Sequence, residues 1–255
     1  MTISRAEKSL YRSLKIKKER EETGLFLVEG IKPVTEALLA GFPLERILIS
    51  DNVAESERLR ILSLANDKNV AVVSVAYPEI DQISSLLNPE GVLAVAKISA
   101  KENLLAPLTY PALYLWQIND PGNLGTILRT ALWFDCRTIL LSPESVDIYS
   151  PKVVRGAMGA NFRLTLRTNV DIHQIEMILA HDNSSLWATD SSGTFDKPTL
   201  ADDRFILAFG SESHGLPPEI LQRAAGVLRI NKYGYGESLN LAVSVGIMLH
   251  TIRQK

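Results

Sequence analysis

The sequence predicts an α/β protein built in two parts. Strand-like apolar runs alternate with segments whose apolar residues recur at helical spacing, along nearly the whole chain. Three glycine-containing loops, at 120–131, 209–216 and 230–244, each follow a strand-like run. The carboxyl ends of parallel strands meet at one edge of a sheet, so we expect these loops to gather there, where α/β proteins hold ligands.

Residues 1–98 are predicted to form a small α/β sandwich. A helix over 7–22 ends at Gly24, and a short strand then ends at Gly30. The following elements alternate as helix 33–40, strand 46–50, helix 55–65, strand 70–75, helix 78–87 and strand 91–98. Residues 99–110, which contain Pro107, are the expected linker between the two parts.

Residues 111–255 are predicted to form a second domain around a parallel sheet. Its expected strands are 112–118, 137–142, 163–166, 185–190, 205–209 and 226–230. Residues 171–181 form an amphipathic helix. The last helix, 238–253, shows no polar stripe before His250, so its apolar surface has to be covered.

Composition places the chain among globular proteins without choosing its chemistry. Its 255 residues, 46% hydrophobic and 22% charged, can form two modest cores. No apolar run approaches the roughly 20 residues of a membrane helix, and the first twenty residues lack the apolar core of a secretory signal. Cys136 is the single cysteine, which excludes an intrachain disulfide and indicates a reducing cytoplasm.

Positive charge is concentrated at the amino terminus, although the formal net charge is −2. The basic residues there are Arg5, Lys8, Arg12, Lys15, Lys17, Lys18 and Arg20, opposed only by Glu7 and Glu19. Such a stripe can follow the phosphates of a nucleic acid even in an acidic protein. The alternative is a solvated helical face. We predict RNA contact for Arg12, Lys15, Lys17, Lys18 and Arg20.

The three loops also carry a family resemblance. DPGNLGTILRTA (120–131), FGSESHGL (209–216) and INKYGYGESLNLAVS (230–244) resemble the signature motifs of the SpoU/TrmH branch of the SPOUT family, RNA ribose 2′-O-methyltransferases that use S-adenosylmethionine. FLVEGIKPVTEALLAG (26–41) is similar to the small RNA-recognition domain that often precedes the catalytic domain.

The resemblance implies a fold and an assembly. It implies a SPOUT-type α/β catalytic domain with a deep C-terminal trefoil knot, a preceding ribosomal-protein-like α/β/α domain, and a homodimer. The presence of the upstream domain favours ribosomal RNA as the substrate, with transfer RNA as the second choice.

The second and third loops are expected to hold S-adenosylmethionine through backbone groups. Gly210 and Gly215 would let the backbone approach the adenosine, and Gly234 and Gly236 permit a tight turn before Ser238, which is expected to cap the last helix. By resemblance, the cofactor-binding residues are Ala208, Phe209, Gly210, Gly215, Ile230, Gly234, Ser238, Leu239 and Asn240. The alternative is that both loops are structural turns only.

The first loop is expected to bind the RNA. Asn123 lies where a helix begins, and free N–H groups at a helix start can bind a phosphate. Arg129 lies further along this helix and, by resemblance, is the arginine nearest the chemistry. A guanidinium stays protonated, so we assign it an electrostatic role: it holds the phosphate beside the target ribose and stabilises negative charge on the 2′ oxygen. The alternative is a surface arginine paired with an acidic residue.

Five polar residues in the loops are candidates for the catalytic machinery. Glu212 can hold Arg129 or accept a hydrogen bond from the ribose, whereas Ser238 and Asn240 can align the nucleophile or cap a helix. The catalytic candidates are Arg129, Asn123, Glu212, Ser238 and Asn240.

Two further basic residues and the histidines complete the candidate list. Lys152 and Arg155, in a segment that also resembles the family, can contact the RNA backbone or lie on a solvated helical face. We predict no metal, because the four histidines show no ligand spacing. They are His173, His181, His214 and His250.

Some residues depart from the family pattern. The third motif has Asn231 where the family usually has proline, and Lys232 where an apolar residue is common. Both substitutions lie in the loop expected to hold the cofactor. Asparagine tolerates unusual backbone angles, so we expect the turn to form.

Three other functions have partial support in the sequence. A hydrolase with Ser213 as nucleophile would need glycine where Ser211 stands, and Pro217 and Pro218 delay the helix that should follow. A dinucleotide oxidoreductase would need a third glycine in the GYGESL segment. The remaining alternative is a non-catalytic RNA-binding or ribosome-assembly protein with the same fold.

Overall fold

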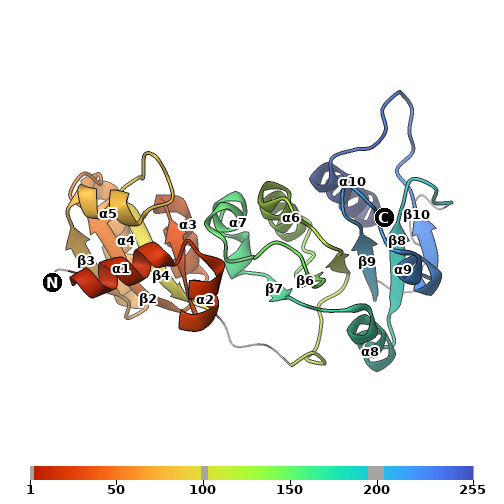
Figure 1. Ribbon diagram of the computed structural model, residues 1–255, viewed down its shortest axis with the longest axis horizontal. Coiled ribbons are helices and arrows are strands. Elements are labelled where there is room, and N and C mark those ends of the chain that lie inside the picture. Colours follow the sequence, from red (N-terminus) through yellow and green to blue (C-terminus); the bar gives the residue numbers. More distant parts are fainter. Residues whose placement is uncertain (1–2, 99–102, 195–203, 255) are drawn as a thin grey trace. The chain divides into compact units, whose positions relative to one another are not determined.

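The computed structural model describes residues 3–98, 103–194 and 204–254, and the chain forms two compact units (Figure 1). The first unit contains residues 3–98 and 147–162. The second contains residues 103–146, 163–194 and 204–254. Of the predicted linker, residues 99–102 lie outside the described residues, whereas Leu104, Leu105 and Leu108 pack against the core of the second unit.

The first unit is built on a four-stranded sheet with the strand order β1-β4-β2-β3. The strands are β1 (Leu25–Glu29), β2 (Leu44–Ser50), β3 (Ala71–Val75) and β4 (Val92–Lys97). β4 runs antiparallel to both β1 and β2, and β2 runs parallel to β3. Side chains of successive strand residues point to opposite faces, and in β1 all five residues are buried. Both faces of this sheet are therefore covered.

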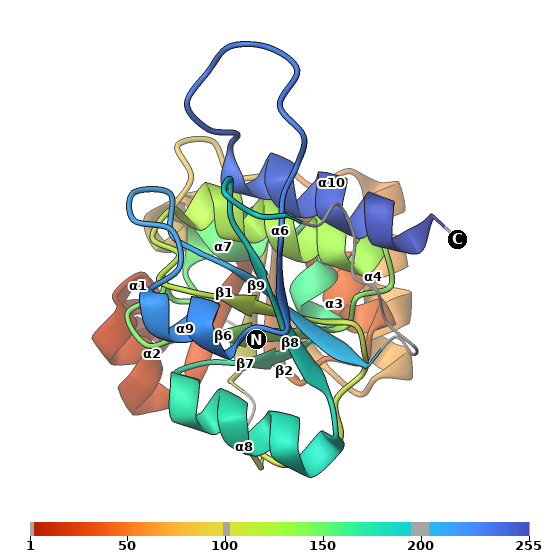
Figure 2. The ribbon, with the colours of Figure 1, turned by 90° about the vertical axis from the view of Figure 1, so that its right-hand side faces the viewer.

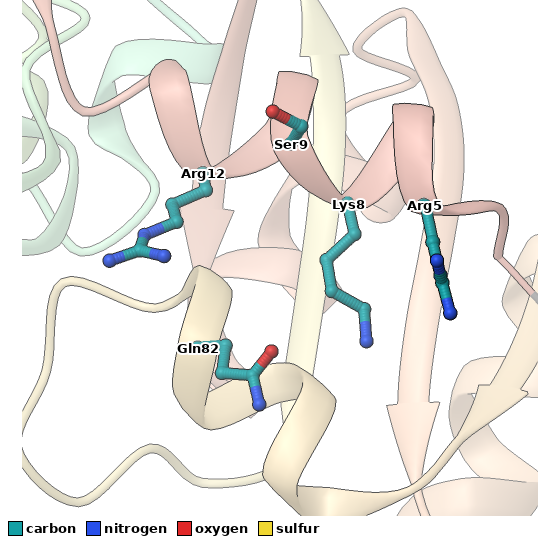
Figure 3. A pocket seen from close by; sticks show the side chains of 5 residues that line it. All are labelled: Arg5, Lys8, Ser9, Arg12 and Gln82. Carbon is teal, nitrogen blue, oxygen red and sulfur yellow. The ribbon is translucent and has the colours of Figure 1, made fainter.

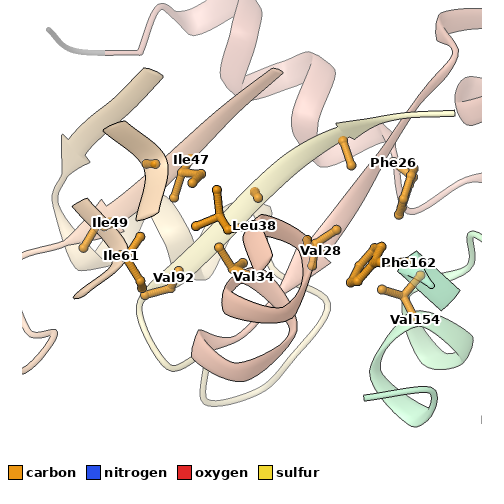
Figure 4. Packing of buried hydrophobic residues seen from close by; sticks show 14 of the residues in the cluster. Phe26, Val28, Val34, Leu38, Ile47, Ile49, Ile61, Val92, Val154 and Phe162 are labelled. Carbon is orange, nitrogen blue, oxygen red and sulfur yellow. The ribbon is translucent and has the colours of Figure 1, made fainter. Parts of the chain in front are cut away.

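Helices cover each face of the first sheet. α3 (Ile31–Leu39) and α4 (Glu55–Asp67) pack on one face through Val34 and Ile61, together with Phe26 of β1 (Figure 4). α1 (Arg5–Ser13) and α5 (Tyr77–Ile83) pack on the other, where Tyr11 and Ile80 join Leu27 of β1 in a separate cluster. This unit is an α/β sandwich, as the alternating pattern predicts.

The helix predicted over 7–22 is two helices. α1 ends at Ser13 and α2 covers Lys17–Thr23; between them Leu14 is fully buried, and Ile16 adopts an extended conformation at the start of α2. Ser4 and Glu7 form a capping box at the start of α1. Gly24, in the left-handed conformation with φ 67°, ends α2.

Residues 147–162 lie in the first unit, although the sequence places them in the second domain. This segment contains α7 (Pro151–Gly156) and a 3₁₀ turn (Ala160–Phe162). Val154 and Phe162 enter the same core as Phe26 (Figure 4), and the Tyr149 ring lies 4.7 Å from the Phe26 ring. Residues 147–162 therefore belong to the first unit because their apolar side chains pack with residues more than a hundred positions away in the sequence.

The second unit has a six-stranded, fully parallel sheet with the order β10-β8-β9-β5-β6-β7. The strands are β5 (Ala112–Leu115), β6 (Thr138–Leu141), β7 (Thr165–Arg167), β8 (Ser185–Thr189), β9 (Phe205–Phe209) and β10 (Gly226–Leu228). Its central strands are buried throughout, as expected for a parallel sheet covered on both faces.

The helices of the second unit form a layer on each face of this sheet (Figure 2). α8 (Ile172–Asp182) and α9 (Pro218–Arg223) cover one face through Ile175 and Ile220. α6 (Pro121–Trp133) and α10 (Leu241–Arg253) lie side by side on the other. Among the described residues, no helix has both the length and the apolarity needed to cross a membrane.

Candidate active site

The loops that follow β8, β9 and β10 meet at the carboxyl edge of the parallel sheet and line a cavity of about 580 Å³. β9 lies between β5 and β8, and β10 flanks β8, so the strand order brings these loops together. The first residues of α10 complete the lining. Two of the three loops predicted to gather at this edge, 209–216 and 230–244, line the cavity, whereas no residue of 120–131 belongs to its lining.

All but one of the predicted cofactor residues line this cavity. Those that do are Phe209, Gly210, Gly215, Ile230, Gly234, Ser238, Leu239 and Asn240. Ala208 lies one residue earlier in β9, in the apolar core, and its carbonyl accepts a hydrogen bond of 2.8 Å from Thr189 Oγ1. Its contribution is to hold β8 against β9 near the cavity.

Gly210 is required by the loop itself. A Cβ at Gly210 would lie 2.0 Å from the carbonyl carbon of Gly215, a distance that no side chain can occupy. The loop is closed by two backbone hydrogen bonds between Ser211 and Gly215, of 2.9 and 3.2 Å, and Gly215 has φ +65°. Close packing of the loop on itself therefore requires glycine at position 210, and the left-handed backbone favours it at position 215; the predicted approach to adenosine stays a prediction.

The third loop, between β10 and α10, is exposed from residue 231 to residue 240 (Figure 1). Its left-handed residue is Gly236, with φ +135°, whereas Gly234 needs no unusual backbone angle. Asn231 and Lys232, which depart from the family pattern, both line the cavity, and Lys232 Nζ donates to the carbonyl of Gly236. This hydrogen bond links the two ends of the turn, in which the family usually has a proline at position 231.

Asn240, and not Ser238, caps the last helix. The Asn240 Oδ1 accepts from the backbone N–H groups of Ala242 at 2.9 Å and Val243 at 3.3 Å. α10 begins at Leu241, later than the sequence predicts, so Ser238 lies in the exposed loop before it. The assignment of the cap to Ser238 is wrong because residues 238–240 continue the loop.

Asn123, Glu212 and Asn240 form one hydrogen-bonded cluster, in which each of the three sequence motifs is represented. Asn123 lies in the first turn of α6, where its backbone N–H donates to the capping Asp120 side chain at 2.7 Å. Its side-chain oxygen accepts from Asn240 Nδ2 at 2.9 Å, and its Nδ2 donates to Glu212 Oε1. The cluster places a carboxylate and two amides at the rim of the cavity.

Arg129 does not join this cluster. Its side chain is exposed on α6, and it makes no hydrogen bond or ion pair with any residue that the structure describes. Glu212 hydrogen-bonds Asn123 and does not hold Arg129. Among the described residues, no acidic side chain pairs with Arg129. Its positive charge is therefore available to bind an anion.

The predicted RNA-binding residues of the amino terminus fall into different environments. Arg20 is buried: its Nε donates to Asp147 Oδ2 at 2.9 Å and its Nη1 to the Leu14 carbonyl at 2.7 Å. The structure therefore gives Arg20 a role in the core. Lys17 and Lys18 are exposed and lie 3.8 and 3.6 Å from Glu21 and Glu22.

The other predicted RNA contacts also differ from one another. Lys15 Nζ donates to the Ser84 carbonyl at 2.6 Å, and Arg12 is exposed. Lys152 is exposed in the first turn of α7. Arg155 donates to Ser85 Oγ at 2.7 Å and lies 3.7 Å from the buried carboxylate of Glu29, so its guanidinium takes part in the packing of the first unit.

The cavity also contains a polar group, at the end of β8, that the sequence pattern does not single out. Asp190 directly follows this strand and lines the cavity with Thr189 and Ser191. Its carboxylate accepts from Ser192 N at 2.8 Å and Ser192 Oγ at 2.6 Å. In the sequence, Asp190 is recognisable only as an acidic residue at the end of a strand. Its place in the cavity follows from the position of β8 beside β9. Among the described residues, no three His, Cys, Asp or Glu side chains gather as metal ligands would.

Comparison with known proteins agrees with this geometry. Residues 111–250 match the SpoU rRNA Methylase family, and residues 8–94 match the MRM3-like substrate binding domain. The human protein "rRNA methyltransferase 3, mitochondrial" is 31% identical over 192 residues, which cover 71% of this chain and 44% of that protein. The chain therefore spans less than half the length of this relative.

Two bacterial proteins match over nearly their whole length. The Bacillus subtilis "23S rRNA (guanosine(2553)-2'-O)-methyltransferase RlmP" is 28% identical over 250 residues, covering 95% of this chain and 94% of that protein. The structure of an AdoMet-bound rRNA methyltransferase from Sinorhizobium meliloti has a TM-score of 0.84 and 28% identity, covering 100% of this chain and 97% of that one. With the family match extending over more than half of its residues, this chain belongs to the SpoU rRNA methylase family.

Proposed function

We propose that this protein transfers a methyl group from S-adenosylmethionine to a ribose 2′-hydroxyl of structured RNA, with ribosomal RNA as the favoured substrate and transfer RNA as the second choice. The observation that carries the proposal is the Asn123–Glu212–Asn240 cluster at the rim of the cavity. Family membership supports the reaction class, and the names of the bacterial and mitochondrial relatives support ribosomal RNA.

The cavity fits a ligand of the size and character of S-adenosylmethionine. Its volume of about 580 Å³ lies within the roughly 300–1,000 Å³ of small-molecule sites. Leu228, Ile230 and Met248 supply apolar surface for an adenine ring, and the carboxylates of Asp190 and Glu237 lie in the same lining. Carboxylates near the cavity favour a ligand with positive charge. When bound there, the cofactor supplies an electrophilic methyl group.

The residues of the chain then have to orient the ribose and handle a proton. For a methyl group to be transferred, the 2′-hydroxyl would have to give up its proton, and the carboxylate of Glu212 is the acceptor that the cluster supplies. Glu212 is the carboxylate of the cluster, and we assign it the hydrogen bond from the 2′-hydroxyl; Asn123 and Asn240 fix its position. Ser238 lies at the same rim and can donate to the ribose.

Arg129 acts by charge in this proposal. Because its guanidinium is unpaired among the described residues and remains protonated, it can bind the phosphate next to the target ribose. It also stabilises negative charge that develops on the 2′ oxygen.

The activity is tested by incubating the full chain with methyl-labelled S-adenosylmethionine and either ribosomal or transfer RNA. We expect label in the RNA, located at a ribose by mass spectrometry. Arg129→Ala should reduce transfer at least about 100-fold, the scale of lost transition-state electrostatics, with cofactor affinity within about twofold. Cofactor binding without transfer to either RNA would favour the non-catalytic alternative instead.

The assembly that we propose is a homodimer formed through the outer faces of α6 and α10. Trp133, Val243 and Ile247 are large apolar residues exposed on these two adjoining helices, with Trp133 84% exposed. Exposed apolar faces of this kind mark protein interfaces, and a twofold axis would cover both copies with the same patch.

The dimer is tested by sedimentation velocity of the full chain. The wild type should sediment as a dimer, and Ile247→Asp should shift it towards the monomer, because a carboxylate would be buried unpaired. The same substitution at the exposed Leu59 of the first unit is the control. A wild-type monomer at micromolar concentration would contradict the proposal. We place the protein in a reducing cytoplasm, in keeping with its buried single cysteine, whose pKa burial raises to about 12.

A further inference from the structure

A groove in the first unit combines several cationic side chains. It has a volume of about 210 Å³, lies between α1 and α5, and is lined by Arg5, Lys8, Ser9, Arg12 and Gln82. Arg5, Lys8 and Arg12 extend from the same side of α1 towards α5, and Gln82 lies on the opposite wall (Figure 3). The groove is separate from the cavity of the parallel sheet, because every lining residue belongs to the first unit.

The spacing of these residues explains their common direction. Positions 5, 8 and 12 are three and four residues apart, so they lie on one face of a helix. Tyr11, on another face of α1, is 1% exposed and packs in the core with Ile80 of α5. The capping box of Ser4 and Glu7 fixes the start of the helix. The cations are thus carried by a helix that is anchored on its opposite side.

The charges of the groove are not balanced internally. Lys8 Nζ is 2.8 Å from Glu79 Oε1, and its hydrogen bond to that carboxylate lowers the pKa of Glu79. Glu7, the acidic residue of α1, pairs with Arg46. Arg5 and Arg12 are exposed and make no hydrogen bond or ion pair with any described residue. Two guanidinium groups therefore remain uncompensated, about 10 Å apart along the axis at 1.5 Å per residue.

We infer that this groove binds the phosphodiester backbone of the RNA substrate, an inference that rests on the proposed function. Its volume is below the roughly 300–1,000 Å³ of pockets for nucleoside-sized ligands, but a phosphate group fits. Guanidinium groups bind phosphate oxygens through paired N–H donors, and the amide of Gln82 supplies a neutral donor on the facing wall. Such contacts position the RNA without reading its sequence.

The test compares two double variants that remove the same charge. Arg5→Gln with Arg12→Gln empties the groove of its unpaired cations. Arg60→Gln with Lys68→Gln removes two exposed cations of the first unit that lie outside the groove lining, and Arg60 is 3.9 Å from Glu57. Binding of end-labelled ribosomal RNA fragments to the full chain is measured by fluorescence anisotropy between 50 and 200 mM salt. Circular dichroism and cofactor affinity, unchanged in both, establish that the variants are folded.

The groove variant should bind RNA on the order of 10-fold more weakly at 150 mM salt, and its slope of log affinity against log salt should be smaller by about 2, one for each lost phosphate contact. The control variant at Arg60 and Lys68 should lose less than about twofold in affinity, with a slope near that of the wild type. Equal losses in the two variants, or none in the groove variant, would overturn the inference. RNA binding by the wild type without methyl transfer would contradict the proposed function alone, because the difference between the two variants would still be measurable.

Discussion

The two units of this chain place their polar groups in opposite ways. In the first unit the buried charged groups are paired internally: Glu29 accepts from Ser85 N at 3.0 Å, and Arg20 is paired with Asp147. In the second unit the polar groups of the motifs lie at the carboxyl edge of the sheet, around a cavity that is open to a ligand. A cation therefore indicates RNA binding in the first unit only where it lacks an internal partner.

The two arginines Arg12 and Arg20 provide the strongest test of this comparison. Arg20→Met keeps the apolar stem but leaves the carboxylate of Asp147 without its partner in a largely buried position. We expect the free energy of unfolding to fall by about 3 kcal/mol, because breaking a buried ion pair from one side leaves an uncompensated charge. Urea unfolding followed by circular dichroism measures this change.

Arg12→Met is the matched control, since Arg12 is exposed on α1. Its unfolding free energy should change by less than about 0.5 kcal/mol, as for most surface substitutions. If the two variants were equally stable, the assignment of Arg20 to the core would be wrong.

A smaller effect is expected in the second unit, where two glycines of the cavity can be compared. A Cβ at Gly210 would meet the Gly215 backbone at 2.0 Å, whereas a Cβ at Gly234 would meet nothing within 4 Å. Gly210→Ala should weaken S-adenosylmethionine binding roughly 10- to 100-fold, which corresponds to the about 1–3 kcal/mol cost of overpacking. Isothermal titration calorimetry measures the affinity.

Gly234→Ala should leave that affinity within about twofold, because its backbone needs no positive φ. Tight cofactor binding by the Gly210→Ala variant would mean that the second loop can open without loss. In that case the loop would not be the rigid support that the structure indicates.

Much of the fold follows from local signals. The alternation of strand-like and helical segments places nearly every element, and Gly24 ends a helix as expected. The break between α1 and α2 was not predicted; Leu14, which lies in it, packs in a core made with residues of the sheet and of α5 that are distant in sequence. For the same reason the packing of residues 147–162 with the first unit was not predicted: Phe162 and Val154 look like any apolar residues until their core is known.

The candidate site shows the same division. The three motifs indicate where the ligand-binding loops lie, but Asp190 carries no motif and reaches the cavity only because β8 lies beside β9. The cap at Asn240 could not be separated from Ser238, since both are good capping residues and only the observed start of α10 distinguishes them.

By itself, the sequence determined the α/β class, the three loops at one sheet edge and the family, because these depend on short-range periodicity and on residues adjacent in the chain. Only the tertiary structure decided which charges are available. Seven basic residues lie in the first twenty positions. Arg20 is paired with Asp147, more than a hundred positions away, whereas Arg5 and Arg12 remain exposed. The energy of a charge depends on its burial and its partner, and both are set by contacts between distant segments.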